Sequence, residues 1–316
     1  MSNKIKQEIN KIEIPKELHE RSKMGILKVK NERYKNRKNY KFKNISLVAG
    51  VIVLIGVISI YNNWNQNNNI PKQGELIVNE DGSIKIPKIQ LSDDLSHADM
   101  IGLIVYNGKI YTQTTTEIKS ENAKKILGEM LGTTKGNIDE WSNQNAYDEE
   151  FASTIGETDV YSVKGYDEEF RIMTYKETEG KSYAEFYESL NGITVHDGED
   201  IFGKLKMSEN VLNAKYRIFS DWDNSIDNYH SISNMDAVNS FIEYLNNAKP
   251  LLRESNSDPI RNSRNNEEYR NLIIELNDGS KVNLTLIKGG YIYYGYMNIY
   301  FKMNENEFLK IWNEIK

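Results

Sequence analysis

The sequence predicts an α+β fold in which antiparallel strands are interspersed with a few helices, preceded by a helical tail and one transmembrane helix. Three observations indicate this class. Short runs of β-forming residues are separated by glycine-containing turns, as in antiparallel hairpins. Amphipathic segments with helical spacing lie between and after those runs. An uncharged apolar run of membrane-span length comes before all of them.

The apolar run extends from Ile45 to Tyr61, and these 17 residues contain no charge. A helix of this length spans roughly 26 Å, which is the short end of a transmembrane helix. Lys41 and Lys43 can snorkel at one interface and Trp64 can lie at the other. A cleaved signal peptide and a buried core helix are the alternatives. We favour the anchor, because 44 residues precede the run and it has no polar face.

Charge gives the orientation of this anchor. Residues 1–44 contain 14 Lys or Arg and 5 Asp or Glu, a net charge of +9, while the remainder carries −15. Basic residues beside a span stay on the cytoplasmic side of the cell membrane. We therefore expect a cytoplasmic N-terminus and an extracytoplasmic C-terminal part.

The basic tail has two short helical patterns. Ile5, Ile9 and Ile12 follow one helical face, and a second segment begins at Pro15, a residue favoured in a first helical turn. So few apolar residues cannot form a core. The tail should be disordered, lie on the membrane, or fold on a partner.

Beyond the span, residues 62–98 are rich in Asn, Asp, Lys and Pro and are interpreted as a linker. Compact structure is expected from about Met100. Asn107-Gly108 can supply both positive φ values of a type I′ turn, which would pair Val105 with Ile110 in a hairpin.

A helix is expected next, with Ser120 as N-cap and Gly132 as its end. Its expected buried stripe consists of Ala123, Ile126, Leu127, Met130 and Leu131. The segment from Asp159 to Val195 then has the turn signals Lys164-Gly165, Glu179-Gly180 and Asn191-Gly192, typical of an antiparallel meander.

A second unit is expected from Asn213, and whether the outer part comprises two related subdomains is left open. Its first helix would bury Val238, Phe241, Ile242 and Leu245 and would end before Pro250. Three strands are predicted after Tyr269, turning at Asp278-Gly279 and Gly289-Gly290. A final amphipathic helix is expected between Asn304 and Ile315.

The resulting expected organisation has five parts: a tail (1–44), a transmembrane helix (45–61), a linker (62–98) and two α+β subdomains (99–212 and 213–316).

Signatures of catalysis and of cofactor binding are missing from the sequence. The chain has no cysteine, its four histidines are far apart in sequence, and it contains neither H-E-x-x-H nor G-x-S-x-G. The stretch TYKETEGKS ends like a phosphate loop but has Tyr175 where the first glycine belongs, so a hairpin turn is expected there. We expect no enzyme activity, no cofactor and no metal.

Two other stretches imitate binding sites. DWDNSIDN resembles the start of a calcium loop, but Ile226 and Ile232 occupy the positions of its glycine and its glutamate, so a solvated acidic loop is the simpler interpretation. The five tyrosines of GGYIYYGYMNIYF could stack sugar rings. Packing within a sheet is the simpler interpretation for them as well. The repeated Tyr-Asp-Glu-Glu-Phe, at 147–151 and 166–170, is interpreted as a chance acidic turn. Nucleic acid is not an expected partner of the acidic outer part.

The tail sequence KIEIPKELHERSKMGILKVKNER, followed by lysines and one span, resembles the N-termini of membrane-bound anti-sigma factors of low-GC Gram-positive bacteria. The outer part is similar to the uncharacterised domains that accompany such tails. This resemblance covers residues 11–65. The zinc-containing anti-sigma domain needs cysteine, so its fold is not carried over.

The resemblance implies that the tail holds an extracytoplasmic-function sigma factor away from RNA polymerase until the outer domain senses a signal. The contact would be apolar and would use Ile12, Ile14, Leu18, Ile26, Leu27 and Val29. The alternative is a membrane-anchored surface module that binds a cell-wall or extracellular ligand, with the tail serving only as a topology signal.

Overall fold

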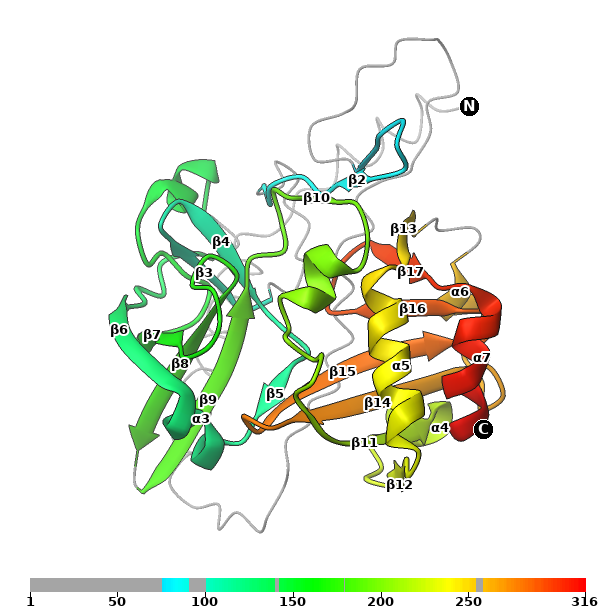
Figure 1. Ribbon diagram of the computed structural model, residues 1–316. Helices are drawn as coiled ribbons and strands as arrows, with labels where there is room; N and C mark the ends of the chain where they lie inside the picture. Colours follow the sequence, from blue (N-terminus) through cyan, green and yellow to red (C-terminus); the bar gives the residue numbers. More distant parts are fainter. Residues whose placement is uncertain (1–75, 91–100, 140–141, 179, 254–257) are drawn as a thin grey trace, which may run out of the picture. The chain divides into compact units, whose positions relative to one another are not determined.

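The computed structural model describes residues 76–90, 101–139, 142–178, 180–253 and 258–316, and these belong to one compact unit. Three antiparallel sheets with interspersed helices make up this part of the chain, which confirms the α+β class (Figure 1). No helix among the described residues is long and apolar enough to cross a bilayer. The predicted tail and span, residues 1–61, lie outside the described residues.

The first large sheet has six strands in the order β3-β4-β9-β8-β7-β6. Its β3–β4 hairpin has the predicted register, with Val105 opposite Ile110, and Asn107 and Gly108 have φ values of 50° and 66°. The meander prediction is confirmed for three strands, β7, β8 and β9, and the phosphate-loop imitation is the β8–β9 hairpin. The strands are β3 (Leu103–Tyr106), β4 (Lys109–Gln113), β6 (Leu127–Thr133), β7 (Asp159–Val163), β8 (Arg171–Thr178) and β9 (Lys181–Glu188).

The helix predicted from Ser120 to Gly132 is wrong in its second half. Only Ser120–Ile126 is helical (α3), and Leu127–Thr133 forms the edge strand β6, with Met130 55% exposed. Gly128 and Gly132 explain the strand. A Cβ on Gly128 would lie 2.8 Å from the carbonyl oxygen of Ser162, and one on Gly132 would lie 2.3 Å from the ring of Phe151. Both glycines therefore permit a close approach that a side chain would block.

The second large sheet has eight strands. Seven follow the order β12-β11-β14-β15-β16-β17-β13, and the short β5 (Glu117–Ile118) pairs with the beginning of β15. Four strands rather than the predicted three follow Tyr269, because Gly295, with a φ of 62°, permits an additional turn. The expected boundary at 212/213 falls inside β11. The strands are β11 (Val211–Ile218), β12 (His230–Ser231), β13 (Lys249–Leu252), β14 (Tyr269–Leu276), β15 (Ser280–Ile287), β16 (Tyr291–Tyr294) and β17 (Ile299–Lys302).

Two amphipathic helices, α5 (Met235–Asn246) and α7 (Glu305–Glu314), cover one face of this sheet (Figure 1). Both were predicted, and α5 buries the four residues expected of it. Each helix has an asparagine N-cap, Asn234 and Asn304, whose side chain accepts a backbone N–H of the first turn. The shorter helical segments are η1 (Gln144–Asp148), the π-helical turn η2 (Glu199–Gly203), α4 (Phe219–Asp223) and α6 (Pro259–Asn262).

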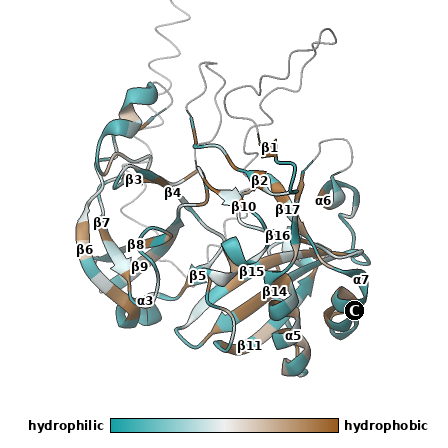
Figure 2. Cartoon of the chain, turned by 45° about the horizontal axis from the view of Figure 1, so that its top comes forward, coloured by the Kyte–Doolittle hydropathy of each residue, from teal (hydrophilic) through white to brown (hydrophobic). Residues whose placement is uncertain are grey.

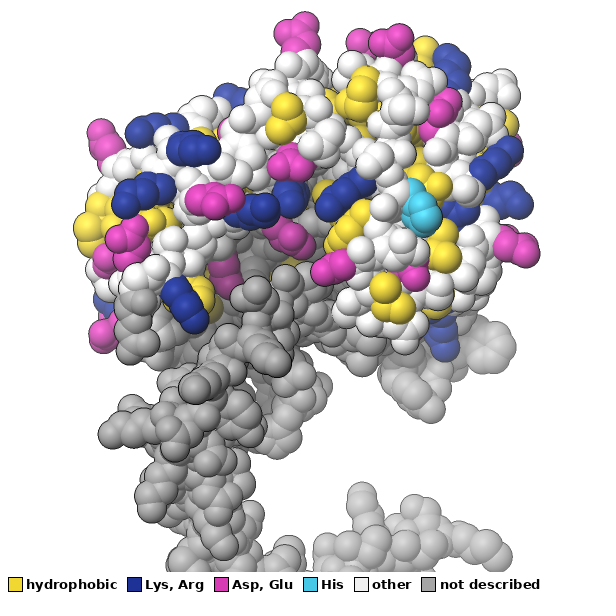
Figure 3. All heavy atoms as spheres, turned by 90° about the horizontal axis from the view of Figure 1, so that it is seen from below, with side chains coloured by type: hydrophobic (Ala, Val, Ile, Leu, Met, Phe, Trp, Pro, Cys, Tyr) yellow, Lys and Arg dark blue, Asp and Glu magenta, His cyan; other side chains and the backbone are white. Residues whose placement is uncertain are grey.

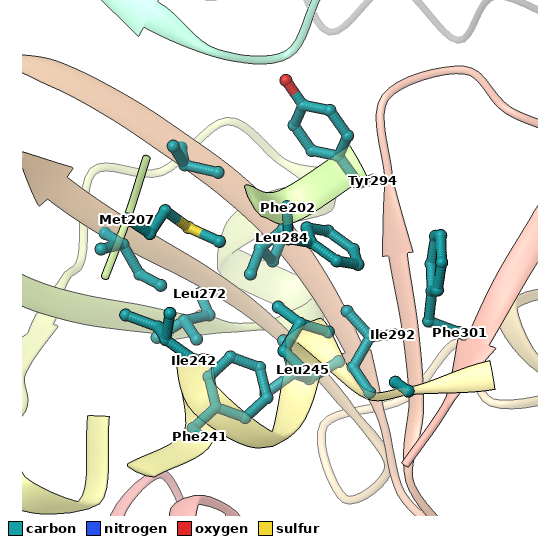
Figure 4. Close-up of a cluster of buried hydrophobic side chains, with 14 of the residues drawn as sticks. Phe202, Met207, Phe241, Ile242, Leu245, Leu272, Leu284, Ile292, Tyr294 and Phe301 are labelled. Carbon is teal, nitrogen blue, oxygen red and sulfur yellow. The ribbon is translucent and has the colours of Figure 1, made fainter. Parts of the chain in front are cut away.

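The main hydrophobic core lies between these helices and the sheet. Hydrophobic residues recur along the strands and helices that enclose it (Figure 2). Figure 4 shows Phe241, Ile242 and Leu245 of α5 among side chains of the sheet strands and of Phe202. Full burial of such side chains contributes about 1.5–3 kcal/mol each.

A third, small sheet joins residues far apart in the sequence. It has the order β1-β2-β10, with β1 at Ile77–Val78, β2 at Ile84–Lys85 and β10 at Thr194–Val195. Ile84 and Val195 are fully buried in the main core. Residues 76–90 were expected to be part of a linker. They are instead packed against the domain, because burial of the Ile84 side chain in the main core stabilises this arrangement.

The two large sheets meet at a buried ion pair. Arg171 of β8 and Glu188 of β9 are both 0% exposed, and an Nη2 of Arg171 lies 2.5 Å from Oε1 of Glu188. Tyr294 of β16 donates its hydroxyl to Glu188, 2.7 Å from Oε2, and Thr114 donates to the same oxygen at 3.0 Å. The hydroxyl of Tyr294 points away from the other labelled core side chains in Figure 4. Glu188 is therefore held by both sheets.

The guanidinium of Arg171 is enclosed by aromatic rings. Its central carbon lies 4.3 Å from the ring centre of Tyr166 and 4.7 Å from that of Phe186. Nη1 of Arg171 has no hydrogen-bond acceptor in the described part of the chain, so the faces of these rings replace one. Tyr166 also donates to Asp278 of the β14–β15 turn at 2.8 Å, which is a second link between the sheets.

Replacing Tyr294 by Phe tests this joint. The change leaves a buried carboxylate with fewer donors, and a hydrogen bond to a charged group contributes about 1.5–3 kcal/mol. We expect the free energy of unfolding of the full chain to fall by about 2 kcal/mol in urea titrations followed by circular dichroism. Tyr183→Phe, at a position 59% exposed, is the control and should change stability by less than about 0.5 kcal/mol. Equal stability of both variants would contradict the assigned role.

Gly198 provides a test of close packing. Its N–H donates to the carbonyl of Ala248 at 2.9 Å, and a Cβ placed on it would lie 1.9 Å from the carbonyl oxygen of Leu245. Gly198→Ala should therefore displace η2 from α5 and lower the free energy of unfolding by about 1–3 kcal/mol.

The matched control is Gly156→Ala, since nothing lies within 4 Å of a Cβ there. We expect it to be close to neutral. A stability loss in Gly156→Ala as large as that in Gly198→Ala would show that packing is not the cause.

Candidate functional site

The residues predicted to bind a partner all lie in the tail. Ile12, Ile14, Leu18, Ile26, Leu27 and Val29 are outside the described residues, so their arrangement stays a prediction.

No group of three or more His, Cys, Asp or Glu side chains that could hold a metal occurs among the described residues. In the stretch that imitates a calcium loop, Asp221 lies in helix α4 and is nearly buried, and its carboxylate accepts from Asn228 at 3.0 Å. Asp223 and Asp227 are exposed. The helix and this hydrogen bond give the segment a structural explanation.

The tyrosine-rich stretch packs within the sheet. Tyr294 and Tyr300 are fully buried, on opposite faces of the sheet. The ring centre of Tyr300 is 6.2 Å from that of Tyr291 and 5.7 Å from that of Tyr293. Because the rings contact each other edge to face or tilted, they do not form a row of open faces on which sugars could stack.

A shallow depression lies beside the C-terminal end of α5. It is lined by acidic and amide side chains around His196 and Asp200. Asp200 accepts the backbone N–H of His196 at 2.7 Å, and its carboxylate lies 3.2 Å from Nδ1 of the same histidine. These bonds close a local turn at the start of η2, which accounts for the cluster structurally.

A deeper groove, with a volume of about 470 Å³, lies at the end of the six-stranded sheet that contains the β3–β4 turn. Its volume is within the range of small-molecule sites. We call it the hairpin groove. Its walls come from parts of six segments: 88–90, 107–110, 144–148, 167–170, 189–193 and Lys204.

The walls of the hairpin groove are held by specific hydrogen bonds. The side chain of Asn191 donates to the carbonyl of Ile110 at 2.7 Å and accepts the N–H of Ile89 at 3.4 Å. Lys109 and Glu169 form an ion pair at 3.0 Å across two segments of the rim. Four separate stretches of chain are therefore fixed relative to one another at this place.

Both copies of Tyr-Asp-Glu-Glu-Phe contribute to the same region. Glu150, in the first copy, accepts the N–H of Asn107 at 2.8 Å, and Glu168, in the second, accepts the hydroxyl of Tyr106 at 2.5 Å. The hydrogen bond to Glu168 raises the pKa of Tyr106 to about 12. The ring of Phe151 stacks on that of Tyr106. The two acidic segments bracket the β3–β4 turn, which the sequence interpretation as a chance turn did not anticipate.

The floor of the hairpin groove is continuous with the buried ion pair. Phe170 and Ser189 line the groove, and they directly neighbour Arg171 and Glu188 in the chain. The N–H of Ser189 donates to the carbonyl of Phe170 at 2.9 Å. A ligand in the groove would thus contact residues beside the joint of the two large sheets.

Asp258 is a further buried carboxylate. It accepts from Nε of Arg253 at 2.7 Å, from the hydroxyl of Tyr300, and from the N–H of Ile260 at 3.0 Å. Burial alone would raise the pKa of Asp258, but the hydrogen bonds from Tyr300 and Arg253 outweigh it and lower that pKa below its ordinary value. All of these contacts serve the start of α6, so the cluster is structural.

Comparison with known proteins gives no relatives for this chain. No protein-family model, no curated protein and no solved structure matches it.

Sequence reasoning missed the hairpin groove because its lining comes from six separate segments. The Asn107-Gly108 turn and the repeated acidic pentapeptide are the signals that point to it. From the sequence alone, neither signal shows that the turn and the acidic segments lie beside each other.

The lowered pKa of Asp258 predicts acid sensitivity. A carboxylate whose pKa is lowered in the folded state stabilises the fold at pH values above its ordinary pKa, 3.8. This contribution is lost as the pH falls through the pKa of the folded state. We expect the stability advantage of the parent over Asp258→Asn to shrink as the pH is lowered from about 5. The check is urea denaturation at successive pH values. A constant difference across this range would contradict the prediction.

Proposed function

We propose that this protein is a single-pass membrane regulator. Its tail, residues 1–44, binds and holds an extracytoplasmic-function sigma factor in the cytoplasm, and its folded outer part senses a signal. The observation that carries the proposal is the reversal of charge across the uncharged run 45–61, from a net +9 before it to a net −15 after it. The resemblance of residues 11–65 to anti-sigma factors of low-GC Gram-positive bacteria supports the identity of the partner.

The physical basis of anchoring is the run itself. A helix satisfies its own backbone hydrogen bonds, so it is the form in which a single segment crosses lipid. Each Lys or Arg beside an anionic membrane surface contributes on the order of 1 kcal/mol of attraction. The basic tail therefore stays with the cytoplasmic leaflet, where a transcription factor can be retained.

The physical basis of retention is apolar contact. The tail has too few apolar residues to fold alone, so its ordering would accompany binding. Leu18 and Ile26 lie eight residues apart, which places them on one face of a helix. A positively charged tail gains nothing by charge from a basic DNA-binding partner, so the apolar stripe would provide most of the affinity.

The folded part supports a sensing role, because its described residues contain a polar groove beside the joint of the two large sheets. The same groove also favours the second candidate function, a surface module that binds a wall or extracellular ligand and uses the tail only for topology.

The tail is tested by replacing both Leu18 and Ile26 with Asp in the full chain. Each substitution removes the burial of one apolar side chain, which contributes about 1.5–3 kcal/mol. Binding of the sigma factor should therefore weaken at least tenfold. The measurement is immunoprecipitation of the full chain from detergent-solubilised membranes, with quantitative mass spectrometry of the sigma factor.

The matched control is Asn10→Asp with Asn31→Asp, which adds the same charge at two polar positions outside the proposed contact residues. The control should retain the sigma factor. Equal recovery with both double variants, or no sigma factor with the parent chain, would favour the surface module instead.

A further inference from the structure

Uncommitted polar groups gather in the hairpin groove. No described residue forms a hydrogen bond or ion pair with the ammonium groups of Lys88 and Lys204, with the side-chain amides of Gln90 and Asn107, or with the carboxylate of Asp148. The ammonium of Lys204 lies 5.9 Å from the ring centre of Phe170. Five polar groups in one concavity are thus available to a ligand.

The groove is lined by three basic and three acidic side chains, so it has no net charge of its own. Lys109 pairs with Glu169 at 3.0 Å, whereas neither Lys88 nor Lys204 forms an ion pair with a described residue. Among the groove's cations, Lys88 and Lys204 are left to meet an anion. These two lysines have no ion pair with a described residue, although the chain beyond the apolar run is acidic overall. On the face shown in Figure 3, by comparison, basic and acidic side chains are interspersed.

The apolar lining favours aliphatic groups over sugar rings. Ile89 and Ile193 are partly exposed in the groove, whereas its two aromatic residues, Tyr147 and Phe170, are nearly buried. Sugar rings need an open aromatic face. Branched aliphatic side chains provide none, but they pack well against a small apolar side chain.

The free amides complement a peptide backbone. Each of Gln90 and Asn107 offers both an N–H donor and a carbonyl acceptor, which is the pair of groups that a peptide unit presents. The groove volume, about 470 Å³, suits a few residues of extended chain.

We propose that the hairpin groove binds the C-terminal end of a short peptide, with the free α-carboxylate between Lys88 and Lys204, backbone groups on Gln90 and Asn107, and a small aliphatic side chain against Ile89 and Ile193. Recognition of a free C-terminal carboxylate is a recurring mode of peptide binding. This inference deepens the proposed sensing function and rests on it for the biological meaning of the ligand.

The position of the groove connects binding to the fold. Phe170 and Ser189 at its floor neighbour the ion pair that joins the two large sheets. An occupied groove would therefore restrain that joint, and ligand binding adds to stability in proportion to its affinity.

The test is equilibrium dialysis of the purified full chain in detergent. The probes are a mixed pool of tripeptides with free C-terminal carboxylates, the same pool as C-terminal amides, and the neutral trisaccharide maltotriose. We expect retention of peptides from the acid pool and at least tenfold weaker retention of the corresponding amides. A tenfold loss corresponds to about 1.4 kcal/mol, a reasonable sum for two partly exposed ion pairs.

Two double variants make the test specific. Lys88→Met with Lys204→Met should lose at least tenfold in affinity for the acid pool, whereas Lys164→Met with Lys176→Met, at exposed positions outside the groove, should not. Circular dichroism of each variant confirms that it is folded.

Three outcomes would overturn the proposal: equal retention of acid and amide pools, retention of maltotriose in place of peptides, or no retention of any probe by the folded parent chain. Dialysis does not involve the tail, and the immunoprecipitation of the sigma factor does not involve the groove. Failure of the peptide site is therefore distinguishable from failure of the proposed regulator.

Discussion

The buried ion pair between Arg171 and Glu188 is the interaction on which the rest of the described structure depends. Two charges without any exposure are costly unless every partner is in place. Here the partners of this pair come from the eight-stranded sheet, through Tyr294, and from the segment that connects the two large sheets, through Thr114. Burial raises the pKa of Tyr294 well above its ordinary value, so its hydroxyl remains a donor to Glu188. Satisfying one carboxylate thus fixes the sheets against each other.

The same constraint positions the hairpin groove. Its floor consists of Phe170 and Ser189, which directly neighbour the two residues of the ion pair in the chain. Its walls are loops joined by the hydrogen bonds of Asn191 and by the Lys109–Glu169 ion pair. Loops on a rigid support are where proteins commonly place binding residues. A rigid floor with uncommitted polar side chains on its rim is the arrangement expected of a preformed site, because little ordering remains to be done when a ligand arrives.

The proposed functions divide the chain by physical character. The basic tail with its sparse apolar residues is suited to folding on a protein partner, and the acidic C-terminal part has a core large enough to fold by itself. Between them lies an uncharged apolar run of membrane-span length, the proposed anchor. A regulator that receives a signal on one side of a membrane and acts on the other requires these three properties in this order.

The sequence by itself determined the elements whose signals are local. The Asn107-Gly108 hairpin, the β7–β8–β9 meander and the amphipathic helices α5 and α7 follow from turn chemistry and periodicity, which act within a few residues. The apolar residues of 127–133 are compatible with either period. Only the close approach of Gly128 and Gly132 to neighbouring chain selects the strand. Tertiary structure alone decided the pairing of β2 with β10, the burial of Arg171 with Glu188, and the assembly of the hairpin groove. The physical reason is the same for all three: each depends on contacts between residues distant in the chain, and no local pattern specifies which distant residue will be the partner.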